Sequence, residues 1–99
     1  MTTPSTSRPA GVATVQLDDG RVKVTQWRLA PGTATGWHRH AHDTIVVPIT
    51  GGRLQVDDGR ETRYAELTAG QSYSRPMGVE HDVGNASDHE IVFVEIELR

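Results

Sequence analysis

Residues 32–51 read GTATGWHRHAHDTIVVPITG and contain three histidines at alternate positions, His38, His40 and His42. The stretch is rich in β-branched residues and ends at glycines, so it predicts an extended strand. Successive side chains of a strand point to opposite faces, so we expect the three histidines and Thr44 to share one face. Two imidazoles placed in this way are able to converge on one metal ion.

A third metal ligand must come from another part of the chain, and His81 is the candidate. It lies in residues 70–85, GQSYSRPMGVEHDVGN, where Pro76 and Gly78 predict a turn just before it. The chain has no cysteine, so nitrogen and oxygen atoms must hold any metal. Imidazole accepts Fe, Mn, Ni, Zn and Cu, and the ligand type alone does not choose among them.

The rest of the chain predicts short strands joined by turns. Asp-Asp-Gly-Arg occurs at residues 18–21 and again at 57–60, and Asp-Gly between extended runs predicts a two-residue hairpin turn. Pro48, inside the run 37–49, indicates an edge strand or a bulge. No long amphipathic helix is indicated. Regularly spaced short strands predict an all-β sandwich or barrel.

The last strand, EIVFVEIEL at residues 90–98, has two different faces. Val92, Val94, Ile96 and Leu98 form one of them, and Ile91 and Phe93 begin the other. The glutamates of this strand, Glu95 and Glu97, are expected to face solvent or a second subunit.

Length and composition limit the organisation and the partners of the chain. Its 99 residues make one domain, with residues 1–10 expected to be a flexible tail and 11–99 the folded domain. The first residues fit neither a secretory signal nor a membrane span, so a cytoplasmic location is the default expectation. A net charge of −3, with dispersed basic residues, argues against nucleic acid and membrane as partners and leaves small molecules.

Both histidine stretches resemble the two conserved motifs of the cupin superfamily. Residues 32–51 match the first motif, which is Gly, five residues, His-x-His, three residues, Glu, six residues, Gly, except that Thr44 stands at the glutamate position. Residues 70–85 match every fixed position of the second motif, namely Gly70, Pro76, Gly78, His81 and Asn85. The two motifs and the hairpin between them span residues 32–85. Among cupins the chain is similar to small single-domain bacterial members, including those associated with β-alanine degradation.

The resemblance implies an all-β jelly-roll β-barrel with a divalent metal in its mouth, held by His38, His40 and His81. Since the family's glutamate is absent, the site has three histidines unless His42 supplies a fourth nitrogen. A metal with only neutral ligands keeps its full charge and attracts an anionic oxygen. So small and open-ended a barrel also usually needs its outer face or edge strands covered, which predicts a homodimer.

We therefore expect a metal-dependent enzyme, either an oxygenase or a lyase or isomerase, that acts on a small oxygen-rich organic acid. The alternatives are a non-catalytic module that binds or senses a metabolite and a structural protein whose site has decayed. His42 and Tyr73 are the candidate catalytic acids or bases. The candidate substrate-binding residues are Arg75, Gln26 and Arg28, for which surface exposure is at least as good a reading, and Trp37, for which the alternative is packing beneath the first histidine.

Overall fold

The structure of the protein is a computed structural model that describes residues 8–99. Most of the predicted tail, residues 1–7, therefore lies outside the described part of the chain. Residues 8–10 are described and contact the folded domain: Ala10 forms a bridge with Ala34, and Arg8 forms ion pairs with Asp57 and Asp82.

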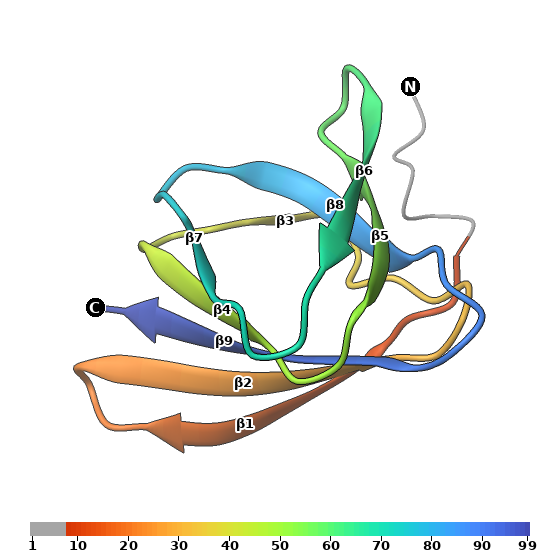
Figure 1. The fold of residues 1–99 in the computed structure, drawn as a ribbon. Coiled ribbons are helices and arrows are strands. Elements are labelled where there is room, and N and C mark those ends of the chain that lie inside the picture. Colours follow the sequence, from red (N-terminus) through yellow and green to blue (C-terminus); the bar gives the residue numbers. More distant parts are fainter. Residues whose placement is uncertain (1–7) are drawn as a thin grey trace.

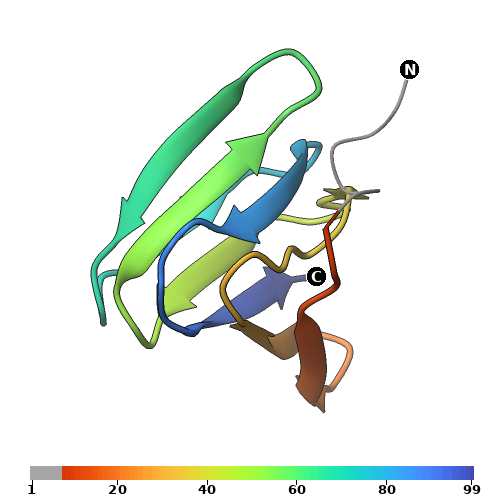
Figure 2. The same ribbon diagram turned by 90° about the vertical axis from the view of Figure 1, so that its right-hand side faces the viewer.

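The described residues form nine strands in two antiparallel sheets, as predicted for an all-β jelly-roll barrel (Figures 1 and 2). One sheet has the order β1-β2-β9-β4-β7, and the other has the order β3-β8-β5-β6. The strands are β1 (Val12–Asp18), β2 (Val22–Leu29), β3 (His38–Arg39), β4 (Thr44–Pro48), β5 (Gly52–Asp57), β6 (Thr62–Leu67), β7 (Tyr73–Arg75), β8 (Glu80–Asn85) and β9 (Ile91–Leu98).

The two predicted hairpins are present, but each turn is centred one residue later than Asp-Gly. In the first, the Asp19 N–H donates to the Val22 carbonyl, so Gly20 and Arg21 form the centre. Gly20 has a φ of 85°, which glycine adopts at little cost. The Asp19 carboxylate accepts backbone hydrogen bonds from Arg21 and Val22, which explains why aspartate precedes glycine. The second hairpin repeats this arrangement at residues 58–61.

The hydrophobic core lies between the two sheets. Strand alternation gives each sheet an inner side that faces this core and an outer side. The five-stranded sheet contributes inner residues from three neighbouring strands, and the four-stranded sheet contributes residues from β5, β6 and β8. The buried core consists of Leu29, Val46, Leu54, Val56, Leu67, Val83, Ile91 and Phe93.

The run 37–49 is not one strand. The chain leaves β3 after Arg39, crosses between the sheets, and starts β4 at Thr44. The expectation that β4 is an edge strand is also wrong, because β4 lies between β9 and β7. The Pro48 carbonyl accepts a hydrogen bond from Gly70 N–H, so its nitrogen points toward the same side, beyond the residues that pair with β7. Pro48 therefore interrupts no ladder bond on that side.

Candidate metal centre

Three imidazoles from two distant stretches of the chain meet inside the barrel. His38 on β3 is directly opposite His81 on β8, and His40 follows β3 by one residue. The Nε2 atom of His40 is 3.3 Å from that of His38 and 3.1 Å from that of His81. His40 and His81 are buried and His38 is half-buried. The convergence predicted from the sequence is therefore present.

Two of the three spacings suit a transition metal, and all three ligand atoms lie within 4.8 Å of one another. Two nitrogens that each lie about 2.0–2.1 Å from one ion are about 2.9 Å apart at a right angle and about 3.4 Å apart at a tetrahedral angle. The two measured Nε2 separations fall between these values. Three neutral nitrogen donors with no thiolate or carboxylate form a site that Fe, Mn, Ni, Cu or Zn can use.

Hydrogen bonds at the opposite ring nitrogens hold two of the imidazoles in place. His38 Nδ1 lies 3.0 Å from the Gly36 carbonyl and can only donate to it. His40 Nδ1 lies 3.1 Å from the Thr44 hydroxyl. Because Nδ1 is used in this way, Nε2 remains available for a metal. Thr44 stands at the position of the family's glutamate. Its hydroxyl holds the imidazole ring of His40 by a hydrogen bond, and it is itself no strong metal ligand.

Burial keeps the cluster in the state that binds metal. Loss of water contact, followed by the nearby charge of His38, lowers the pKa of His81 to about 3. The same two causes lower the pKa of His40. Both rings are therefore neutral at pH 7, and neutral imidazole is the form that coordinates a metal ion.

A buried ion-pair cluster fixes the loop before His38. Arg8 lies 2.7 Å from Asp82 and 3.0 Å from Asp57, and the Asp82 side chain is fully buried. The other oxygen of Asp82 accepts a hydrogen bond from Gly36 N–H at 3.1 Å. Since the Gly36 carbonyl accepts from His38, this network connects the N-terminal segment to a candidate ligand.

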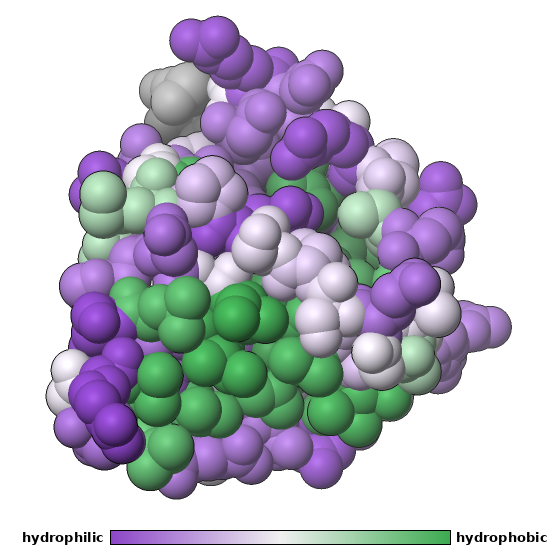
Figure 3. Space-filling view, turned by 60° about the vertical axis from the view of Figure 1, so that its left-hand side comes forward, coloured by the Kyte–Doolittle hydropathy of each residue, from purple (hydrophilic) through white to green (hydrophobic). Residues whose placement is uncertain are grey.

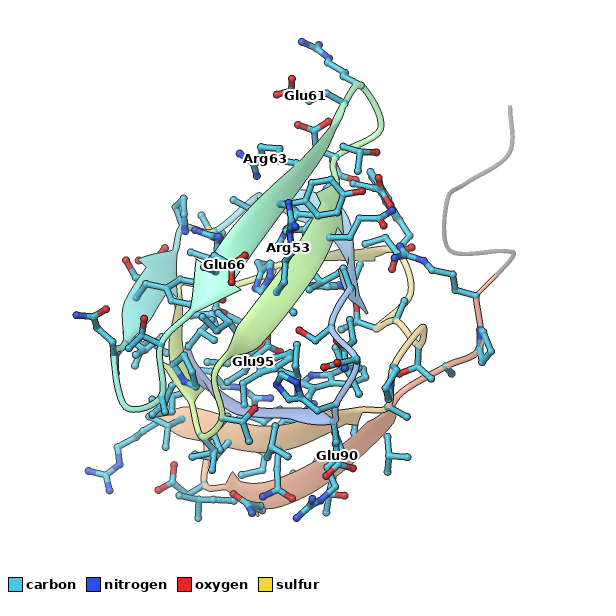
Figure 4. All side chains as sticks on the ribbon, turned by 45° about the vertical axis from the view of Figure 1, so that its right-hand side comes forward. Arg53, Glu61, Arg63, Glu66, Glu90 and Glu95 are labelled. Carbon is cyan, nitrogen blue, oxygen red and sulfur yellow. The ribbon has the colours of Figure 1, made fainter. Side chains whose placement is uncertain are left out.

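A small cavity of about 20 Å³ adjoins the histidines, which is room for about one water-sized group. Its floor is apolar and comes from the core. Its polar lining includes Tyr73 and Glu95 in addition to the three histidines. Glu95 projects from the inner side of β9, and Trp27 Nε1 donates to its Oε1 at 3.1 Å (Figure 4). Burial raises the pKa of Glu95, an effect that the charge of His38 and the Trp27 hydrogen bond oppose.

A larger cavity of about 330 Å³ lies at the open mouth of the barrel. Its walls come from β1, β2, β3, β4 and β9, and it shares His38, His40 and Glu95 with the small cavity. Lys23 also lines it, and the salt bridges within the described residues do not include Lys23. The candidate metal centre is therefore open to a small molecule on a side lined by the cations Lys23 and Arg39 and by the carboxylates Glu95 and Glu97.

Two further predicted site residues lie at the small cavity. Tyr73 and Arg75 face inward from β7, and both line it. The Arg75 guanidinium lies 4.8 Å from the centre of the Tyr73 ring. Burial raises the pKa of Tyr73, so its hydroxyl stays protonated at neutral pH.

The structure does not bring the other predicted residues to the histidines. His42 lies in the crossing between β3 and β4, so strand alternation fails for it, and the metal-ligating group does not include it. Trp37 lies near the β5–β6 turn, beside Gly59. Gln26 and Arg28 lie on the outer side of β2, opposite Val94 and Val92. None of these four residues lines either cavity.

Sequence reasoning missed Glu95 and its partner Trp27. The alternation of β9 predicted correctly that Glu95 shares a face with Phe93, and Phe93 is buried. The signal was present in that pairing, because a charged residue on the face of a buried aromatic residue must have a partner. Arg8 and Asp82 gave no comparable signal, since the contact joins residues 74 positions apart.

Comparison with known proteins places the chain in a family. The model of the Cupin domain matches residues 25–97, and the chain belongs to the cupin family. It is 55% identical over 92 residues to the Pseudomonas aeruginosa protein named Beta-alanine degradation protein BauB, covering 93% of this chain and 97% of that protein.

Solved structures agree with this placement. The chain is 54% identical to a cupin domain from Bordetella pertussis, with a TM-score of 0.90 over 94% of this chain and 97% of that one. A protein with a double-stranded β-helix domain from Klebsiella pneumoniae shares the fold at 23% identity, with a TM-score of 0.74 over 96% and 80% of the two chains. Within residues 8–99, no helix has the length and apolar character needed to cross a membrane.

Proposed function

We propose that the protein is a metal-dependent enzyme, an oxygenase or a lyase or isomerase, that acts on a small organic acid. The observation that carries this proposal is the convergence of three imidazole Nε2 atoms beside a cavity that is also lined by a half-buried carboxylate, Glu95. Similarity to the protein named Beta-alanine degradation protein BauB supports a small acid of this metabolic type as the substrate.

His38, His40 and His81 would hold the ion. A divalent metal on three neutral ligands supplies a Lewis acid that polarises a substrate oxygen, and iron or copper would in addition allow oxygen chemistry. Trp27 holds Glu95 by Oε1 and leaves Oε2 to exchange a proton with a substrate in the cavity. The Tyr73 hydroxyl, protonated at neutral pH, is a hydrogen-bond donor in the same cavity.

Lys23 supports an acid as the substrate. It lines the mouth cavity, and the carboxylates there have other partners: Glu95 accepts from Trp27, and Glu97 accepts from Arg99 Nε at 3.1 Å. We propose that the Lys23 ammonium attracts the carboxylate of the incoming substrate. The substrate would then place a second oxygen toward the histidines.

An enzyme is favoured over a module that only binds a metabolite because of Glu95 and Tyr73. Burying a carboxylate costs free energy, and a binding site for an anion has no use for a negative charge beside it. A cytoplasmic location and a homodimer stay predictions.

The test is turnover by metal-loaded protein. The purified protein is loaded separately with Fe(II), Mn(II), Ni(II), Cu(II) and Zn(II) and incubated with a panel of three- and four-carbon oxo and hydroxy acids. Oxygen consumption identifies an oxygenase, and product analysis identifies a lyase or isomerase. We expect turnover with at least one pair of metal and acid, and its loss in Glu95→Gln. Metal binding without turnover of any acid would contradict an enzymatic role.

A further inference from the structure

The first described residues of the chain lie against the loop that precedes β3 (Figures 1 and 2). We call residues 8–11 the N-terminal arm. The Gly11 N–H donates to the Ala34 carbonyl at 2.9 Å, and the Ala34 N–H donates to the Pro9 carbonyl at 2.9 Å. Ala34 itself is buried. These two backbone hydrogen bonds hold the arm in a defined position on the folded domain.

The side chain of Arg8 extends this contact across the outer side of β8. Its guanidinium lies against the backbone of Gly84, where any larger side chain would collide with it. It forms ion pairs with two carboxylates, that of Asp82 at 2.7 Å and that of Asp57 at 3.0 Å. Asp82 and Asp57 are directly opposite each other on β8 and β5. Arg8 is therefore the cation that compensates two buried negative charges.

Asp82 connects Arg8 to the loop before His38. One oxygen of its carboxylate bonds to Arg8, and the other accepts the Gly36 N–H at 3.1 Å. The Gly36 carbonyl in turn accepts from His38 Nδ1 at 3.0 Å. Gly36 has a φ of 87°, which glycine adopts at little cost. A continuous series of hydrogen bonds thus leads from the N-terminal arm to the ring nitrogen opposite the Nε2 atom that faces the other histidines.

His38 is the candidate ligand that depends most on such support. It is half-buried, whereas His40 and His81 are buried. Its strand, β3, contains two residues and lies at the edge of its sheet, where it pairs with β8. So short an edge strand has few ladder hydrogen bonds and little local stability of its own. The position of the His38 ring is therefore set largely by the hydrogen bond at Nδ1.

We infer that Arg8 is a positioning residue for the candidate metal centre: it holds His38 where its Nε2 atom can join those of His40 and His81. The inference rests on the metal centre of the proposed function and adds the N-terminal arm to it. Partners that orient a metal-ligating histidine change the metal affinity about 10- to 100-fold when they are removed. Because linked equilibria are reciprocal, a bound metal should in turn stabilise the arm.

The affinity of the folded protein for Zn(II) tests the inference. Arg8→Met removes the guanidinium but keeps an aliphatic chain over Gly84, and it should raise the Zn(II) dissociation constant about 10-fold. Loss of a positive charge by itself would act in the opposite direction, because a less positive protein attracts a cation more strongly. Arg8→Lys keeps the charge without the guanidinium fork and should have an intermediate affinity. Isothermal titration calorimetry at pH 7 gives the constants, and circular dichroism checks that each variant is folded.

Thr62→Val is the matched control. The Thr62 hydroxyl donates to Asp57, so this variant disturbs the same cluster on the branch that does not lead to Gly36. It should lower the free energy of unfolding and leave the Zn(II) dissociation constant at the wild-type value. Equal or tighter Zn(II) binding by folded Arg8→Met would overturn the inference, and so would an equal weakening in Thr62→Val. If Arg8→Met does not fold, Arg8→Lys takes its place and must bind Zn(II) more weakly than Thr62→Val.

Hydrogen exchange of the Gly11 and Ala34 amides gives a second readout, because both amides donate to the backbone bonds of the arm. Zn(II) should slow their exchange in the wild-type protein and slow it less in Arg8→Met. Exchange rates in the wild type that Zn(II) leaves unchanged would overturn the coupling of the arm to the centre. A wild-type protein that binds no Zn(II) would overturn the metal centre of the proposed function, and this inference with it.

Discussion

Near the barrel mouth, the two sides of β9 in the five-stranded sheet reverse the usual distribution of polarity. On its inner side, near the barrel mouth, β9 presents Glu95 and Glu97. On its outer side the same strand presents Val94, Ile96 and Leu98. A sheet in a small globular protein normally places apolar side chains inside and polar ones outside. Here one strand carries both exceptions.

This comparison shows where the chain departs from what stability alone requires. A polar group in the interior costs free energy unless it has a partner, and an exposed apolar row gains nothing from water. Departures from the consistent pattern are therefore expected at sites of function. In this chain the inner departure lies beside three convergent histidines, and the outer departure is an apolar row on the outer side of β9. Figure 3 shows a continuous hydrophobic area across the lower half of this view of the molecule.

The largest expected effect is on metal affinity. His81→Ala removes one of three nitrogen ligands, so the dissociation constant for Zn(II) or Ni(II) should rise at least about 100-fold. His89→Ala is the control, because His89 is exposed and bonds to the Gly51 carbonyl, outside the candidate centre. Isothermal titration calorimetry measures both variants. Equal affinities in the two variants would show that the inner histidines do not bind the ion.

The buried and exposed ion pairs provide the second contrast. Arg8→Ala leaves the buried carboxylates of Asp57 and Asp82 without their cation and should lower the free energy of unfolding by about 3 kcal/mol. Arg53→Ala is the matched control, because Arg53 and Glu66 lie 3.6 Å apart and exposed on β5 and β6 (Figure 4). In that variant the free energy of unfolding should fall by less than about 1 kcal/mol.

Urea denaturation at pH 7 measures both losses. Similar small losses would mean that the Arg8 cluster contributes no more than a surface pair, and the proposed support of the loop before His38 would have to be abandoned.

The third prediction concerns pH and the metal-free protein. The pKa of His81 is lowered to about 3 in the folded state and is about 6.5 in the unfolded state. Between these values the unfolded chain binds more protons, so stability falls as the pH falls from about 6.5, by up to about 1.4 kcal/mol per pH unit. His81→Gln should flatten this dependence. Denaturation in chelator at pH 4.5 to 7.5 measures it, and an unchanged slope in the variant would contradict the burial of a neutral His81.

The smallest expected effect is a gain in stability on replacing Glu95. Burial raises the pKa of Glu95, so the folded state is penalised once the carboxyl ionises. Glu95→Gln keeps an acceptor for Trp27 and should increase the free energy of unfolding by about 1 kcal/mol at pH 7. Since both states are protonated below pH 4.5, the gain should disappear there. A loss of stability at pH 7 would show that Glu95 is a structural residue.

Local patterns in the sequence predicted much of the fold. The two hairpins follow from Asp-Asp-Gly-Arg, and the opposed faces of β9 follow from its alternation. His38, His40 and His81 could be grouped because two motifs frame them. The break at residues 40–43 could not be predicted, because strand propensity continues through it and only the crossing to the other sheet interrupts the strand.

What sequence reasoning missed depends on contacts between distant strands. Glu95 meets the histidines only because β9 lies between β2 and β4, and that order is a property of the whole barrel. The same topology places Gln26 and Arg28 on the outer side, away from the centre. Thr44 was recognised as a departure from the family pattern, but its hydrogen bond to His40 required the three-dimensional arrangement.

X-ray absorption spectroscopy of the protein loaded with one equivalent of Zn(II) or Ni(II) tests the central claim most directly. If His38, His40 and His81 bind one ion, the spectrum should show three imidazole nitrogens at about 2.0–2.1 Å from it. A first shell made of oxygen atoms, with scattering from fewer than two imidazoles, would contradict the assignment of these residues as a metal centre.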